Sequence, residues 1–260
     1  MTLIWVYILS GVYGLCVGSF LNVVIYRLPR GMNLAKPSSH CTSCGYVLRW
    51  YDNIPVLSYL ILGGKCRKCH EHISFRYTAV ELLNTALWLL SAWRFWETSI
   101  LYAIAAMLVS SLLICIGFID LETMFIEDIL VYLLAIPAVM AMISGTNGSL
   151  ADRLIGIAVG GGSFLLFYLL AKLILKKEGL GLGDVMLMAF LGGFLGWKAV
   201  LVAVLIASVL GTVILVPKQL VGKDKKGTEY PFGPFLAFGA VVAMFVTEPL
   251  LTWYLSLFRL

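Results

Sequence analysis

The chain has 260 residues, a net charge of +5 at pH 7 and a mean hydropathy of +0.96. Sixty-one per cent of its residues are hydrophobic and 13% are charged, against roughly 25% charged in an average soluble domain. A water-soluble protein of this size cannot bury so much apolar surface, so the composition excludes an ordinary globular domain and indicates a membrane protein.

Apolar runs that approach the roughly 20 residues needed to cross a bilayer core recur along the whole chain. We expect about eight transmembrane helices, at residues 1–26, 78–93, 99–119, 129–144, 154–175, 185–196, 199–217 and 233–258. The segment 185–196 is short for a span, which favours a tilted helix or one packed inside the protein. The expected fold class is therefore an all-α polytopic membrane protein.

The first apolar run, residues 1–26, contains no charged residue and leads directly to Arg27. A cleavable signal peptide has a basic segment before a shorter apolar run. We therefore interpret these residues as a retained first span rather than as a removed signal sequence.

The lysines and arginines predict the orientation, because basic residues concentrate in cytoplasmic loops. Fifteen of the 19 lie in three clusters, at 27–77, 172–177 and 218–226. Eight alternating spans place all three clusters on one side, so we expect the loop 27–77 in the cytosol and both termini outside. The positive charge then reflects topology, and no nucleic acid partner is expected.

Four cysteines lie in the most polar segment with the spacing C-x2-C-x21-C-x2-C, at Cys41, Cys44, Cys66 and Cys69. Two pairs at this spacing can bring four thiolates into the tetrahedron of a zinc site. Two disulfides are the less favoured alternative, because the cytosol keeps thiols reduced. Four thiolates leave no position open for water, so we expect the zinc to be structural rather than catalytic.

Residues 27–77 are thus predicted to form a small cytosolic zinc-binding region between the first span (1–26) and a membrane-embedded core (78–260). Three histidines flank the cysteine pairs: His40, His70 and His72. Any of them could replace a cysteine as a ligand, but exposed loop histidines are the interpretation we prefer.

Two aspartates are predicted to lie near the cytosolic ends of spans. Asp120 follows GFI in the third run, and Asp184 follows the glycines of GLGLGD. Ionisable groups in spans are costly and mark functional sites by default. Two carboxylates from different helices suit an aspartyl hydrolase, in which one activates water and the other polarises the scissile carbonyl. The structural alternatives are a helix N-cap for Asp184 and a solvated helix end for Asp120.

The glycines before the second aspartate, Gly181 and Gly183, are candidate substrate-binding residues. Without side chains they allow an extended peptide to lie close beside Asp184.

Taken together, these motifs resemble the type IV prepilin peptidases, which are GxGD-type intramembrane aspartyl proteases. The resemblance covers nearly the whole chain. The matching motifs are GSFLNVVIYRLP (18–29), the four cysteines with WYDNIPVLSYL between them, ISFRYTAVELL (73–83), ID (119–120), GLGD (181–184) and PFGPFL (231–236).

The resemblance implies that Asp120 and Asp184 are catalytic and that the four cysteines bind zinc. It implies cleavage of the short basic leader of type IV prepilin or pseudopilin precursors at the cytosolic face of the bacterial inner membrane. Many family members, which serve type IV pilus and type II secretion systems, then methylate the new N-terminal residue with S-adenosylmethionine. The cysteine-bearing region is linked with that methylation.

Two positions depart from the family pattern. Glu127 stands where the family usually has proline, and Met186 where it usually has lysine. The first adds a negative charge near the expected site. The second means that a lysine beside Asp184 is not essential if this chain is active.

For methylation the sequence shows no glycine-rich Rossmann signature. The candidates to bind the methyl donor or the pilin amine are Trp50, Tyr51, Asn53, Glu81 and Asn84. Aromatic side chains attract cations, although tryptophan and tyrosine also anchor proteins at the membrane interface. Glu81 is the favoured candidate, because its carboxylate could orient an amine.

Two other classes of function are alternatives. An ion-coupled transporter could use Asp120 and Asp184 to carry protons or cations across the membrane. A non-catalytic pilus or secretion assembly protein could bind pilins without cleaving them. The position of the acids at one membrane edge, and the lack of a visible inverted repeat, favour the peptidase.

Overall fold

The computed structural model describes residues 2–146, 148–175, 181–220 and 230–257. In this part of the chain the backbone is almost wholly helical, and the strand-like pairings are two isolated bridges. The α-helices are α1 (Thr2–Arg27), α2 (Leu57–Ile61), α3 (Arg76–Phe95), α4 (Ile100–Thr123), α5 (Asp128–Leu133), α6 (Ala135–Ser144), α7 (Leu150–Leu170), α8 (Leu182–Leu195), α9 (Trp197–Leu220) and α10 (Gly233–Leu257). Shorter turns are η1 (Leu28–Arg30), η2 (Trp50–Asn53) and the π-helical η3 (Ala171–Leu175). The expected all-α fold is confirmed.

Five helices in the described residues are long and apolar enough to cross a membrane: Leu3–Arg30, Ile100–Thr123, Leu150–Ile174, Trp197–Pro217 and Gly233–Leu257. Two shorter apolar helices cover Asp128–Ser144 and Leu182–Leu195. The predicted span 78–93 is helical within α3, whose sequence is more polar and includes Glu81 and Asn84. The chain is therefore a multi-pass membrane protein.

Several residues used to predict the orientation lie outside the described residues, namely Lys176, Lys177, Lys223, Lys225 and Lys226. The sidedness of the loops remains a prediction from the sequence.

The chain divides into two compact units, unit 1 at Met1–Trp93 and unit 2 at Arg94–Leu260. The boundaries predicted from the sequence, after residues 26 and 77, separate functional regions rather than compact units. Because α3 clusters with α1 and the cysteine region, unit 1 contains the first predicted span, the polar loop and the whole of the second predicted span (78–93). The assignment of separate functions to these regions remains a prediction.

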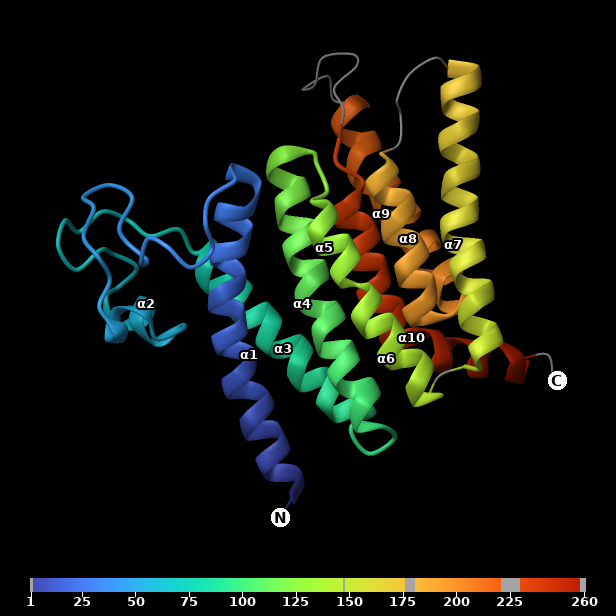
Figure 1. Cartoon of the computed structure of the whole chain (residues 1–260), viewed down its shortest axis with the longest axis horizontal. Helices are drawn as coiled ribbons and strands as arrows, with labels where there is room; N and C mark the ends of the chain where they lie inside the picture. Colours follow the sequence, from blue (N-terminus) through green and yellow to red (C-terminus); the bar gives the residue numbers. More distant parts are fainter. Residues whose placement is uncertain (1, 147, 176–180, 221–229, 258–260) are drawn as a thin grey trace. The chain divides into compact units, whose positions relative to one another are not determined.

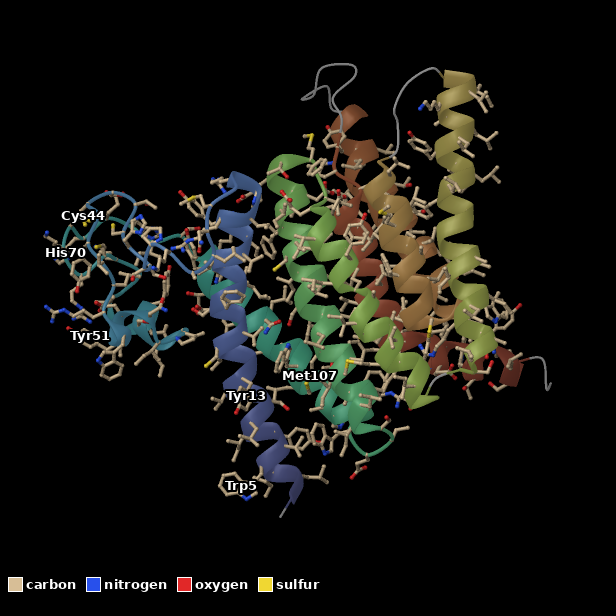
Figure 2. All side chains as sticks on the ribbon, in the orientation of Figure 1. Trp5, Tyr13, Cys44, Tyr51, His70 and Met107 are labelled. Atoms are coloured by element: carbon tan, nitrogen blue, oxygen red, sulfur yellow. The ribbon has the colours of Figure 1, made fainter. Side chains whose placement is uncertain are left out.

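In unit 1, α1 and α3 are joined by side-chain amides. Asn22 on α1 donates a 2.9 Å hydrogen bond to the carbonyl of Tyr77, and Asn84 on α3 donates a 2.8 Å bond to the carbonyl of Gly14. Such bonds hold helices together in lipid, where burial of apolar surface does not. Trp5, labelled on α1 in Figure 2, is exposed, as expected for a side chain that faces lipid.

Unit 2 is a bundle in which α8 is the central element (Figure 1). It packs against α5, α6, α7, α9 and α10. The contact with α7 is closest where Gly156 faces Gly192, because a Cβ on either glycine would overlap the carbonyl oxygen of the other. Small residues at such crossings let two helix backbones approach and gain van der Waals contact.

The outer surface of unit 2 carries large apolar side chains. Leu173 is 75% exposed, and Ile143 and Leu205 are also largely exposed. In water such a surface would be a strong aggregation hazard, but against lipid tails it carries no penalty. The exposed apolar side chains therefore agree with the membrane assignment.

Arg153 on α7 is fully buried and secures the C-terminal end of α8. It donates hydrogen bonds to the carbonyls of Gly193 at 3.3 Å and of Phe194 in the last turn of α8, and to the carbonyl of Thr146. A cation at a helix C-terminus also complements the helix dipole. The opposite, N-terminal end of α8 carries Asp184.

We expect Gly156→Ala to destabilise the protein, because the new methyl group would collide with the α8 backbone. Overpacking of this kind costs about 1–3 kcal/mol. Gly162→Ala on the same helix is the control, because its Cβ would meet nothing within 4 Å. Thermal unfolding in detergent, followed by tryptophan fluorescence, compares the two variants. Equal midpoints would contradict close packing of α7 and α8.

Candidate functional site

Asp120 lies in the last turn of α4 and is only 4% exposed. Its Oδ2 accepts a 2.9 Å hydrogen bond from the backbone N–H of Gly233, the first residue of α10. The N-terminus of a helix carries a partial positive charge, which favours an anion at this position. The burial excludes the alternative of a solvated helix end.

Asp184 is the third residue of α8. Its Oδ2 accepts a 3.3 Å hydrogen bond from the N–H of Gly181, the residue that precedes the helix. Asp184 therefore helps to cap α8, although Gly181 and not Asp184 is the N-cap residue. Its Oδ1 is buried and has no hydrogen-bond partner among the described residues. A buried oxygen without a partner calls for an explanation, and a water or ligand is the usual one.

The two aspartates come from segments far apart in the sequence, yet they lie on helices, α4 and α8, that both contact α5 and α10. The short helix α5 packs on both α4 and α8. The buried side chain of Ile126, just before α5, lies against Gly183 at the start of α8. The contact is close: a Cβ added to Gly183 would come within 3.1 Å of the Ile126 Cβ. The structure thus brings both acids to adjoining helix ends within unit 2.

Gly233 was not among the sequence-predicted site residues, although it lies in the PFGPFL motif. A Cβ at this position would come within 2.5 Å of Oδ2 of Asp120. The close approach of the α10 backbone to the carboxylate therefore requires glycine. The available signal was a glycine between two prolines and aromatic residues, but the sequence does not reveal which side chain it meets.

The two family departures lie around the aspartates. Glu127 is half-buried and immediately precedes α5, and Met186 lies exposed in α8. Gly181 is exposed ahead of α8, whereas Gly183 lies in its first turn against Ile126. These positions leave Gly181 the more accessible of the two candidate substrate-binding glycines.

The four cysteines of unit 1 form one cluster, in which their sulfur atoms all lie within 4.8 Å of one another. The Sγ atoms of Cys41 and Cys69 are 3.8 Å apart, and those of Cys44 and Cys66 are 4.0 Å apart. A tetrahedral metal with bonds of about 2.3 Å to sulfur needs S···S distances of about 3.8 Å. The cluster therefore fits a four-coordinate metal ion.

Each cysteine pair lies on a tight turn, and Figure 2 labels Cys44 and His70 in this region. The Cys41 N–H donates to the Tyr46 carbonyl, and the Cys66 N–H donates to the Glu71 carbonyl, both at 2.9 Å. The residue after each second cysteine has a positive φ, 69° at Gly45 and 57° at His70. His70 thus forms part of the turn. Among the described residues, the side chains close enough together to hold a metal ion are those of the four cysteines.

The pKa of the Cys41 thiol is lowered by its turn. Hydrogen bonds from the backbone N–H groups of Cys44 and Ser43 lower its pKa to about 6. A metal ion binds the thiolate rather than the thiol, so this turn favours metal binding near neutral pH.

Asp52, in η2, joins the two cysteine turns and was not predicted from the sequence. Its Oδ1 accepts a 2.6 Å hydrogen bond from Arg67 Nε, and its Oδ2 accepts bonds from the Tyr46 hydroxyl and the Arg49 N–H. Burial raises the pKa of Asp52, but these donors outweigh burial and the net pKa is lowered. The stabilisation is therefore present above the ordinary aspartate pKa of about 3.9 and is lost as the pH falls below it.

The residues predicted for methylation divide into two groups. Asn53 and Glu81 line a cavity of about 420 Å³ in unit 1. Neither Trp50 nor Tyr51 is among the described residues that line the cavity. Trp50 is 80% exposed, and the Tyr51 hydroxyl accepts a hydrogen bond from Arg49. Asn84 is fully buried in the α1–α3 contact described above.

Comparison with known proteins gives matches over both units. The profile of the bacterial peptidase A24 N-terminal domain matches residues 12–95, and that of the type IV leader peptidase family matches residues 107–216. A protein of Pseudomonas putida named prepilin leader peptidase/N-methyltransferase is 35% identical over 91% of this chain and 89% of its own. Proteins of that name from Burkholderia pseudomallei and Myxococcus xanthus are 37% and 42% identical, over 92% and 78% of this chain and 84% and 60% of theirs. No solved structure matches the chain.

We expect Cys41→Ser to lose most of the bound metal and to lower the thermal stability of the protein, because three thiolates cannot complete the tetrahedron. Cys16→Ser, on α1 and outside the cluster, is the control and should retain full metal content. Elemental analysis of both purified variants by mass spectrometry makes the comparison. Full metal content in Cys41→Ser would refute the proposed ligand set.

Proposed function

Because the chain belongs to the type IV leader peptidase family of prepilin leader peptidase/N-methyltransferases, we propose that it cleaves the basic leader from type IV prepilins or pseudopilins. It then methylates the new N-terminal residue with S-adenosylmethionine. The protein lies in the bacterial inner membrane, with the cysteine loop and both aspartates on the cytosolic side. The predicted topology of the basic loops supports this orientation.

The catalytic groups of the peptidase are Asp120 and Asp184. The observation that carries this assignment is the position of two acids at adjoining helix ends, together with the buried Oδ1 of Asp184, which has no hydrogen-bond partner among the described residues. One carboxylate, ionised, takes a proton from water, which attacks the peptide carbonyl. The other, protonated, donates a hydrogen bond to that carbonyl oxygen and stabilises its developing charge. The peptide C–N bond then breaks, and the leaving amine takes the proton that the first carboxylate accepted from water. The unpartnered Oδ1 of Asp184 supports a position for this water.

The substrate of such a site is a membrane-inserted peptide. A prepilin has a short basic leader followed by an apolar helix, so the helix rests in lipid while the leader remains in the cytosol. A pair of acids at the membrane edge meets the junction between them. The exposed Gly181 supports an extended backbone lying beside Asp184. Entry from lipid would exclude soluble proteins.

The metal of the cysteine cluster is zinc, held by Cys41, Cys44, Cys66 and Cys69. The near-tetrahedral sulfur distances and the all-thiolate donor set support zinc over harder metals, which prefer oxygen. Bound there, zinc supplies a structural crosslink between the two turns and leaves no open position for catalysis.

The methylation site lies in the cavity of unit 1. Its volume of about 420 Å³ is within the range of small-molecule sites, roughly 300–1,000 Å³. S-adenosylmethionine, when bound, supplies an electrophilic methyl group on a positively charged sulfur. In this proposal Asn53 and Glu81 hold and orient the reactants, whereas Trp50 and Tyr51 act outside the cavity.

An ion-coupled transporter and a non-catalytic assembly protein are not favoured, because the relatives of this chain carry an enzyme name. Two measurements distinguish the three functions. With a purified prepilin, release of the leader identifies the peptidase, and binding without cleavage identifies the assembly protein. Cation flux into proteoliposomes, without cleavage of prepilin, identifies the transporter.

We expect Asp120→Asn and Asp184→Asn each to lower the rate of leader cleavage by at least about 10²–10⁴-fold, the usual contribution of an acid–base group. Glu127→Gln is the matched control, because it removes a carboxylate near the same site that the proposed mechanism does not use. Mass spectrometry of a co-expressed prepilin measures leader loss and the added methyl group. Wild-type cleavage by either asparagine variant would overturn the assignment.

Gly233→Ala should also reduce cleavage, because the methyl group displaces Oδ2 of Asp120 from the N-terminus of α10. We expect a loss of about 10²-fold in kcat, as for removal of one positioned donor, with little change in KM. Gly162→Ala again serves as the control. Unchanged kcat in Gly233→Ala would contradict a role for α10 in positioning Asp120.

A further inference from the structure

The cavity in unit 1 is built from several elements. α1 contributes Asn22 and Tyr26, α2 contributes Tyr59, and α3 contributes Tyr77 and Glu81. The turns that carry the cysteines form another part of the wall. The cavity therefore combines three tyrosine side chains with one carboxylate from α3.

Glu81 is held in place although it is only 8% exposed. Its Oε2 accepts a 2.8 Å hydrogen bond from the backbone N–H of Val56, and the side chain of Ser19 also hydrogen-bonds to it. No lysine, arginine or histidine forms an ion pair with Glu81 in the part of the chain that the structure describes. A buried carboxylate without a counter-charge is costly and is seldom kept without a function.

The donor at Val56 is part of a strained turn. Val56 has φ 62° and ψ −50°, and the Leu57 N–H bonds across it to the Pro55 carbonyl at 2.6 Å. A positive φ is a genuine outlier for a β-branched residue, and turns of this form are rare. Strain of this kind concentrates at ligand sites, where the surroundings enforce it. Here it directs one N–H group at Glu81.

Of the other charged groups that line the cavity, Glu71 is exposed, whereas Asp52, Arg67 and Arg27 are engaged elsewhere. Asp52 is paired with Arg67 at 2.6 Å. Arg27 donates hydrogen bonds to the carbonyls of three residues in the following loop, Asn33, Leu34 and Pro37. Glu81 is therefore left as a buried negative charge that a ligand could neutralise.

We propose that the Glu81 carboxylate binds the positive group of an organic cation, either a sulfonium or a primary ammonium, inside this cavity. Tyr26, Tyr59 and Tyr77 provide the aromatic surroundings that favour such cations. The inference rests on the proposed function, because methylation of a peptide N-terminus requires one sulfonium and one amine. It adds that Glu81 acts through its negative charge, which recognises the positive charge of one of these two reactants.

Binding to the purified full-length protein in detergent tests this inference with two ligand pairs that differ in charge. The first pair is S-adenosylmethionine and S-adenosylhomocysteine, which differ in the charge on sulfur. The second is a short apolar peptide beginning with phenylalanine, with a free or an acetylated N-terminus. Isothermal titration calorimetry gives Kd for each ligand, and the pair in which the charged member binds more tightly identifies the source of the cation.

We expect Glu81→Gln to reduce the preference for the charged member of at least one pair by about 10- to 100-fold, as for loss of a charged hydrogen-bond partner. Glutamine can still accept the Val56 N–H bond, so the fold should be retained. Glu97→Gln, an exposed residue of unit 2, is the control and should leave both preferences unchanged. A wild-type preference in Glu81→Gln for both pairs, or no preference in the wild type, overturns the inference.

If Glu81→Gln does not fold, Glu81→Asp is the second variant. It keeps the charge but withdraws the carboxylate by one methylene, so the charge preference should still fall. A wild-type preference in Glu81→Asp would then overturn the inference. Metal retained by the cysteine cluster of unit 1, together with thermal unfolding in detergent, reports whether each variant is folded.

The inference and the proposed function fail in distinguishable ways. A wild-type protein that neither cleaves nor methylates a prepilin, yet binds a cation through Glu81, refutes the function alone. A protein that cleaves and methylates, but binds both ligand pairs independently of Glu81, refutes the inference alone.

Discussion

Lipid is the constraint on which the structure of this protein depends. Hydrocarbon offers no hydrogen bonds, so each spanning segment must satisfy its own backbone and can only be a helix. The free backbone N–H and C=O groups then remain only at helix ends. The candidate peptidase site is built at such ends: Asp120 closes α4, Asp184 opens α8 and Gly233 opens α10.

The helix ends also explain how two acids persist in an apolar protein. Each aspartate accepts a hydrogen bond from a backbone N–H at or just before the start of a helix, Asp120 from Gly233 and Asp184 from Gly181. These donors and the helix dipoles offset part of the cost of burying carboxylates. The glycines are needed for different reasons. Gly233 lets α10 approach Asp120, whereas Gly156 and Gly192 let α7 pack tightly on the central α8.

Unit 1 meets a different difficulty, because its polar loop is too short to build a hydrophobic core. Small folds of this kind are usually held by disulfides or a metal. Here four cysteines converge, and Asp52 ties the two cysteine turns together through Tyr46 and Arg67. The loop in turn supplies the strained Val56 N–H that holds Glu81. The cysteine cluster therefore contributes to the cavity both directly, because Cys41 and Cys66 line it, and by fixing the turns around it.

The sequence by itself determined the features that depend on composition and spacing. Apolar runs specify the helices, two cysteine pairs specify the cluster, and the acids that interrupt apolar segments point to Asp120 and Asp184. Contacts between distant segments were decided only by the tertiary structure. The meeting of Gly233 with Asp120, the pairing of Asp52 with Arg67 and the exclusion of Trp50 from the cavity depend on how helices and turns pack. The periodicity of apolar residues along a chain predicts which face of a helix is apolar, but it does not predict which distant backbone or side chain that face will contact.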